Sequence, residues 1–115
     1  MHTLLSPRLH GVVDYVAVAL FALAPSLLGL DGLAATLSYA LAVIHLLMTL
    51  ATAFPLGVAA LVPFRLHGTV ELAVGAALVL AGFFAFDGAA QGFFVAMGAV
   101  ILAVWAATAY DGEGA

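Results

Sequence analysis

Two histidine–carboxylate pairs are the residues of this chain best suited to chemistry. His10 precedes Asp14 by four positions, and His67 precedes Glu71 by the same spacing. Residues four apart on an α-helix share one face, so each pair presents an imidazole beside a carboxylate. Facing each other, the two pairs would supply nitrogen and oxygen donors that suit zinc, iron or manganese. The spacing therefore predicts a metal site on His10, Asp14, His67 and Glu71.

A third histidine belongs to the same predicted site. His45 is followed by Thr49 and Thr52, four and seven positions later, and together they form one stripe along a helix. We expect His45 to join the two pairs and the threonines to support them from behind. The second half of the chain has Ile101 or Leu102 where a matching histidine would fall. The predicted site is thus asymmetric at this one position.

The same residues admit other interpretations. The two histidines could bracket a haem iron, or the cluster could relay protons, because histidine titrates near neutral pH. They could also join helices structurally, with His10 bonded to Glu71 and His67 to Asp14. An ionisable side chain deep in lipid is unfavourable by roughly 2.5–3.5 kcal/mol, so any of these roles places the cluster inside the protein. The residues leave metal binding, haem binding, proton transfer and structural bonding open.

Enzymatic motifs are missing from the chain. It contains no nucleophile elbow, no His-Glu-x-x-His sequence, no phosphate-binding glycine loop and no EF-hand loop. We therefore expect first a binding or transfer protein, second an accessory membrane subunit, and only third a membrane enzyme that uses the cluster as a metal or acid–base centre. One short chain offers little room for a transport path, so transport would require a homo-oligomer or a membrane partner protein.

Four long apolar stretches must position these residues. Each has close to the roughly 20 residues that a helix needs to cross about 30 Å of hydrocarbon. Helices satisfy their own backbone in lipid, and short connections make consecutive helices antiparallel neighbours. Ser6 and Pro7 suit the start of the first helix. The predicted spans are Leu9–Leu28, Leu33–Phe54, Phe64–Phe86 and Ala89–Tyr110.

Composition supports a protein of the lipid bilayer. Of 115 residues, enough for one domain, 67% are hydrophobic and 7% are charged. Soluble domains are nearer half apolar and about a quarter charged. Two Lys and Arg residues cannot neutralise a nucleic-acid backbone, and the absence of Cys excludes disulfides and thiolate ligands. The sequence thus predicts an all-α integral membrane four-helix bundle, with no nucleic-acid partner.

The two basic residues indicate an orientation. Arg8 and Arg65 both fall at the end shared by the N-terminus, the connection between the second and third spans, and the C-terminus. The positive-inside rule places that end, and with it both termini, in the cytoplasm. We interpret both arginines as interface anchors that extend their charges toward water.

The chain reads as an internal duplication. Three short matches recur in order at an offset of 57 or 56 residues: 8–15 with 65–72, 31–32 with 87–88, and 51–54 with 107–110. The predicted repeats are 1–56 and 57–115, two parallel helical hairpins related by a pseudo-two-fold axis along the membrane normal. Gly11 and Gly68 are expected to let the first and third helices approach closely.

One segment near the end of the first predicted helix carries a resemblance to a known family. It reads Ala24-Pro25-Ser26-Leu27-Leu28-Gly29-Leu30. With its two tandem helix pairs, the chain resembles the small bacterial SPW-repeat membrane proteins, which carry Ser-Pro-Trp there. Here Ser-Pro-Trp is degraded, and the second half has Ala81-Gly82-Phe83-Phe84 instead. The resemblance implies a four-helix protein of a bacterial or archaeal inner or plasma membrane. It implies no activity, so no functional residue is carried over from it.

Overall fold

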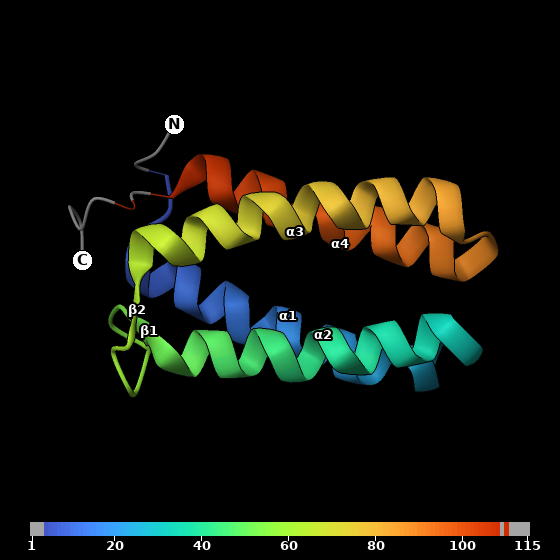
Figure 1. The fold of residues 1–115 in the computed structure, drawn as a ribbon, viewed down its shortest axis with the longest axis horizontal. Helices are drawn as coiled ribbons and strands as arrows, with labels where there is room; N and C mark the ends of the chain where they lie inside the picture. The colour runs from blue at the N-terminus through green and yellow to red at the C-terminus, as the bar shows by residue number, and fades with distance from the viewer. Residues whose placement is uncertain (1–3, 109, 111–115) are drawn as a thin grey trace.

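The chain folds into two helical hairpins that lie side by side (Figure 1). The computed structural model describes residues 4–108 and 110. Within them the elements are α1 (Pro7–Leu28), α2 (Gly32–Ala51), β1 (Thr52–Ala53), β2 (Val62–Pro63), α3 (Phe64–Ala85) and α4 (Gly88–Ala107). α1 packs against α2 and α3 against α4, while β1 and β2 form a short parallel pair. The predicted all-helical fold of four helices is confirmed.

Local sequence signals set the ends of α1. The Ser6 side chain accepts a hydrogen bond from the Leu9 N–H at 3.2 Å, and Pro7 is the first helical residue. Proline suits this position because its missing N–H would have no helical partner there. Gly29 ends the helix with a φ of 66°, which glycine adopts without steric penalty. The predicted Ser6 cap is confirmed.

The predicted second and fourth spans are too long at their C-terminal ends. α2 and α4 stop where Thr52 and Thr108 take extended backbone, with ψ of 141° and 140°. Each threonine hydroxyl donates to the carbonyl four residues earlier, at 2.6 Å from Met48 O and Val104 O. Ala109, in the fourth predicted span, lies outside the described residues. The threonines thus end both helices and keep a free oxygen lone pair.

Neighbouring segments satisfy the last carbonyls of α2 and α4. The Leu61 N–H donates to Ala51 O at 2.7 Å, and the Leu5 N–H donates to Ala107 O at 2.9 Å. Terminal helix carbonyls have no partner inside their own helix, so these bonds replace contacts with water. They also tie the entry of α3 to the end of α2, and the entry of α1 to the end of α4.

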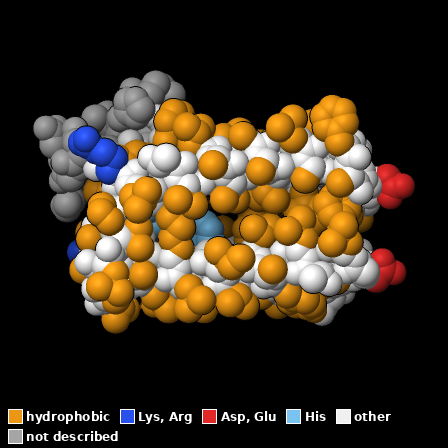
Figure 2. Space-filling model, in the orientation of Figure 1, with side chains coloured by type: hydrophobic (Ala, Val, Ile, Leu, Met, Phe, Trp, Pro, Cys, Tyr) orange, Lys and Arg blue, Asp and Glu red, His pale blue; other side chains and the backbone are white. Residues whose placement is uncertain are grey.

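All four helices are long and apolar enough to cross a membrane. The most apolar 18-residue stretch of each has a mean hydropathy of 1.8 or 1.9. Hydrophobic side chains cover the lateral face, while basic side chains lie at one end and acidic ones at the other (Figure 2). Exposed large apolar residues include Leu23, Leu27, Val43, Leu47 and Phe84. A lateral surface of this kind suits lipid rather than water.

Glycines bring α3 and α4 together, but not α1 and α3. A Cβ on Gly98 would lie 2.7 Å from Gly75 O, so only glycine permits this approach of α3 and α4. A Cβ on Gly11 would instead meet the Leu56 side chain at 2.9 Å, and one on Gly68 would meet the Tyr110 ring at 2.7 Å. The predicted role of Gly11 and Gly68 in close α1–α3 packing is therefore wrong, because they make room for side chains.

Candidate metal centre

Four of the predicted site residues converge at one end of the bundle. His10 and Asp14 come from the first turns of α1, and His67 and Glu71 from the first turns of α3. Their exposed fractions are 0%, 2%, 1% and 3%. One potential ligand atom of each residue lies within 4.8 Å of the others. We refer to these four residues as the candidate metal centre, or simply the centre.

Nitrogen and oxygen atoms alternate around the centre. Between the hairpins, Nε2 of His10 lies 2.8 Å from Oε1 of Glu71, and Nε2 of His67 lies 3.1 Å from Oδ2 of Asp14. Within each helix, the His10–Asp14 distance is 3.3 Å and the His67–Glu71 distance is 3.5 Å. A tetrahedral ion with ligand bonds of about 2.0–2.1 Å separates its ligands by about 3.3 Å. The four nitrogen–oxygen spacings lie around this value, although two of them use different oxygens of Glu71 and the full ligand set spans up to 4.8 Å.

Several of these atoms are close to one another without being hydrogen-bonded. Nε2 of His10, Nε2 of His67 and Oδ2 of Asp14 are buried and have no hydrogen-bond partner among the described residues. The nitrogen–oxygen distances are short, but the angles are unsuitable for hydrogen bonds. Buried polar atoms are normally paired because an unpaired one costs about 1–3 kcal/mol. These three atoms meet at one point, within ion-pair distance of the opposite carboxylates and histidines, and the arrangement is compatible with a shared cation.

Two threonines determine which nitrogen of each histidine faces the centre. Thr108 Oγ1 lies 2.8 Å from Nδ1 of His10, and Thr52 Oγ1 lies 2.7 Å from Nδ1 of His67. Each hydroxyl already donates its one proton to a helix carbonyl, so toward the histidine it accepts. The Nδ1 atoms therefore carry the protons. In the neutral rings this leaves the Nε2 lone pairs free to bind a metal.

Each carboxylate also has a hydrogen-bond partner outside the centre. His45 Nε2 lies 3.3 Å from Oδ1 of Asp14, within hydrogen-bonding geometry. The Tyr110 hydroxyl donates to Oε1 of Glu71 at 3.2 Å. Burial, and then the neighbouring Glu71 carboxylate, raise the pKa of the Tyr110 phenol, which therefore remains a donor. All four members of the centre thus have an oriented supporting partner, as metal ligands typically do.

The supporting residues differ in part from those expected. Thr52 contacts the centre, whereas the Thr49 hydroxyl donates to the backbone of His45 at 2.7 Å. Thr108 and Tyr110 were missed as site residues. The sequence could have identified them through the 56-residue offset, which aligns Thr108 with Thr52 and Tyr110 with Phe54. Tyr110 supplies a hydroxyl where its counterpart Phe54 has none.

Arg8 and Arg65 stand apart from the chemistry of the centre. Both side chains are exposed, and they begin the helical turns that carry His10 and His67. Basic side chains are visible only at this end of the face shown in Figure 2. Their position agrees with anchoring at a membrane surface.

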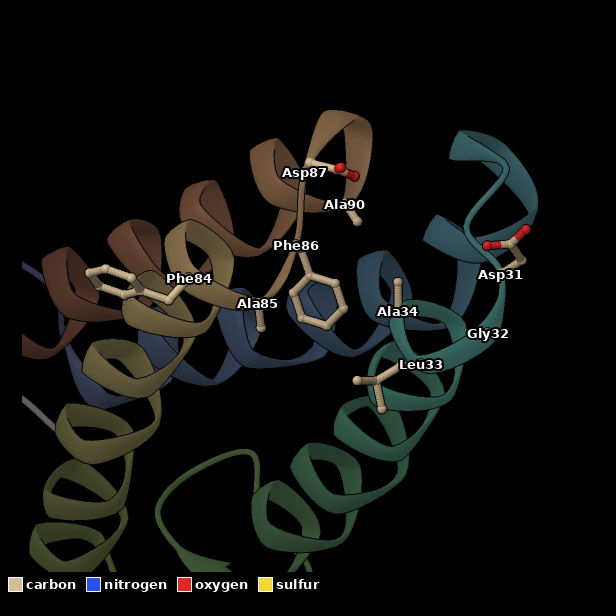
Figure 3. A pocket seen from close by; sticks show the side chains of 9 residues that line it. All are labelled: Asp31, Gly32, Leu33, Ala34, Phe84, Ala85, Phe86, Asp87 and Ala90. Atoms are coloured by element: carbon tan, nitrogen blue, oxygen red, sulfur yellow. The ribbon is translucent and has the colours of Figure 1, made fainter.

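A cavity lies at the opposite end of the bundle (Figure 3). It has a volume of about 530 Å³ and lies between the turns that join the helices of each hairpin. Asp31 and Asp87 stand at its rim and Phe86 points into it. Both aspartates are exposed, and neither makes a capping hydrogen bond to its helix. This cavity therefore lacks the buried, converging donors of the centre.

No family model, curated protein or solved structure matches this chain. The geometry and charge of the centre indicate what it can bind. Two carboxylates with two neutral imidazoles carry a charge of −2 in a buried site. Such a charge is strongly unfavourable unless it is balanced. One divalent cation, or one proton on each histidine, would balance it.

Proposed function

We propose that this chain is an integral membrane protein that binds one divalent transition metal ion through His10, Asp14, His67 and Glu71. The observation that carries the proposal is the pair of buried Nε2 atoms without hydrogen-bond partners, each held by a threonine on its Nδ1 side. Protonated histidines joined to carboxylates would direct Nε2–H bonds at oxygen atoms instead. A metal ion explains the convergence of lone pairs.

The donor set narrows the class of metal. Two imidazole nitrogens and two carboxylate oxygens suit zinc, iron(II) and manganese(II). The chain has no cysteine to supply the soft thiolate ligands that favour copper(I). Haem fits the geometry less well. Carboxylate oxygens lie 2.8 and 3.1 Å from the two Nε2 atoms, where the macrocycle would have to pass.

We place the centre on the cytoplasmic side of the membrane. Arg8 and Arg65 begin the helices that carry the centre, and the positive-inside rule assigns their end to the cytoplasm. Asp14 is the eighth residue of α1, about 10 Å along the helix from its start. The ion would therefore lie within the bilayer but close to the cytoplasmic surface.

Elemental analysis of the detergent-purified chain tests the proposal. We expect close to one zinc, iron or manganese ion per chain after incubation with these ions and removal of the excess. His10→Ala and His67→Ala should each reduce this to a small fraction. Thr69→Val is the control on α3, because it removes an exposed hydroxyl that bonds only the Arg65 carbonyl, at 3.2 Å, among the contacts described. A metal-free wild-type chain after all three incubations would overturn the proposal.

Structural bonding between the hairpins is the second candidate. The contacts of 2.8 and 3.1 Å between the hairpins favour it, since charged histidine–carboxylate pairs have similar distances. In that case chelators would leave the stability of the protein unchanged. Metal binding predicts that a chelator lowers the stability and that added metal restores it.

A further inference from the structure

The two hairpins meet along two seams, one between α1 and α4 and one between α2 and α3. The side chains along these seams are buried to different extents. Four positions of α1 and α4 are buried: Ala17, Met97, Ile101 and Val104. Their counterparts under the predicted repeat lie in the α2–α3 seam and are all partly exposed: Val74, Leu41, His45 and Met48. Figure 2 shows the α2–α3 face, with histidine visible at the base of a hollow between the hairpins. One seam is thus sealed and the other is open beside the centre.

A small cavity occupies the open seam. Its volume is about 30 Å³, which is room for about one water molecule. Met48, Val70, Val74 and Ile101 are among its apolar walls. Glu71, a member of the centre, also lines it. The cavity therefore connects the lateral surface of the protein with the centre.

His45 gives this cavity its second polar group. Its side chain is 11% exposed, and its Nε2 bonds the Asp14 carboxylate on the side of the open seam. The counterpart Ile101 is apolar and 4% exposed. Polar groups next to the centre, Glu71 and His45, therefore line only the open seam. A small ligand that entered there could form hydrogen bonds with them. The predicted duplication does not account for the difference between His45 and Ile101. Two equivalent halves that only hold the hairpins together would carry the same residue at both positions.

Resting on the proposed function, we infer that the metal ion keeps one coordination position open toward this cavity. At rest the ion would have only its four protein ligands, and a narrow anion of two or three atoms would add as a fifth. Four protein ligands close most structural zinc sites, but zinc coordination can expand from four to five ligands. The imidazole of His45 stands beside this position as a hydrogen-bonding partner. The centre is therefore built to bind an external small ligand rather than to hold the hairpins together.

Cobalt(II) and azide provide the test on the detergent-purified full chain. The visible spectrum of cobalt(II) weakens when a four-coordinate ion gains a fifth ligand. We expect azide to produce a saturable loss of absorbance in the cobalt-loaded wild type. Val74→Phe fills the cavity and should weaken azide binding at least 10-fold. Leu72→Phe, which adds the same ring to the exposed side of α3, should bind azide like the wild type.

Each outcome decides the inference. If azide leaves the spectrum of the cobalt-loaded chain unchanged, the open coordination position is wrong. The proposed metal binding is not affected by that result. Equal azide affinity in Val74→Phe and in the wild type would show that the ligand does not enter through the seam. Met48→Phe, which fills the cavity from α2, replaces Val74→Phe if that variant does not fold. Failure of the wild type to bind cobalt would overturn both proposals.

Discussion

Oγ1 of Thr52 lies 2.7 Å from Nδ1 of His67, so the residue that ends α2 orients the ring at the start of α3. Thr108 and His10 repeat this relationship at 2.8 Å between α4 and α1. Each threonine thus has two tasks. It ends its own helix through a bond to a backbone carbonyl, and it orients a ligand of the other hairpin. Helix termination and ligand geometry are coupled at these two residues.

Removing either threonine hydroxyl should weaken metal binding. Thr52→Val and Thr108→Val keep the side-chain shape but leave the Nδ1–H of the histidine unpaired. Loss of such a supporting bond typically lowers metal affinity 10–100-fold. Competition with a chelator of known affinity measures the change. Thr49→Val is the control, since that hydroxyl bonds only the backbone of its own helix among the contacts described. An equal loss in Thr49→Val would contradict the supporting role.

Neutral substitutions of the carboxylates should separate a metal centre from structural bonding. In a chelator, the double variant Asp14→Asn with Glu71→Gln should unfold at the wild-type temperature or higher, because it removes two unbalanced buried charges. Zinc at about 1,000 times its dissociation constant should stabilise the wild type by about 4 kcal/mol and the variant not at all. Thermal unfolding in detergent measures both. A variant destabilised by about 3–5 kcal/mol in chelator would instead indicate ion pairs.

The Tyr110 phenol should resist ionisation. Burial and the adjacent Glu71 carboxylate raise its pKa above the ordinary value of about 10, so the neutral form is favoured in the folded state. The stability it contributes is complete below pH of about 10 and is lost as the pH rises further. Ultraviolet titration of the folded wild type and Tyr110→Phe should therefore give the same tyrosinate signal up to pH of about 11. A larger signal from the wild type would show that Tyr110 ionises normally.

The contact between α3 and α4 should not tolerate a methyl group at Gly98. A Cβ there would lie 2.7 Å from Gly75 O and 2.9 Å from Val79 N, which are backbone atoms that cannot move alone. We expect Gly98→Ala to lower the free energy of unfolding by about 1–3 kcal/mol. Gly92→Ala on the same helix meets nothing within 4 Å, so it should be neutral or stabilising by up to about 1 kcal/mol. Unfolding of both variants in detergent checks the difference.

Much of the fold could be predicted from the sequence because its signals are local. Length and apolar composition identify four helices, and Ser6, Pro7 and Gly29 mark the boundaries of α1 through backbone chemistry that neighbouring residues decide. The ends of α2 and α4 were harder to predict from the sequence. Thr52 and Thr108 are compatible with a helix, and their extended backbone accompanies hydrogen bonds to distant parts of the chain.

The sequence by itself determined the pairing of each histidine with a carboxylate, since the helical repeat places residues four apart on one face. Only the tertiary structure decided what those pairs do together. Their direction toward one point, the support from Thr108 and Tyr110, and the unequal seams all depend on how two hairpins dock. Docking is set by side chains that meet across the interface, as where the rings of His10 on α1 and Phe64 on α3 pack edge to face with their centres 5.3 Å apart. Such packing between residues far apart in the chain leaves no periodic trace in the sequence.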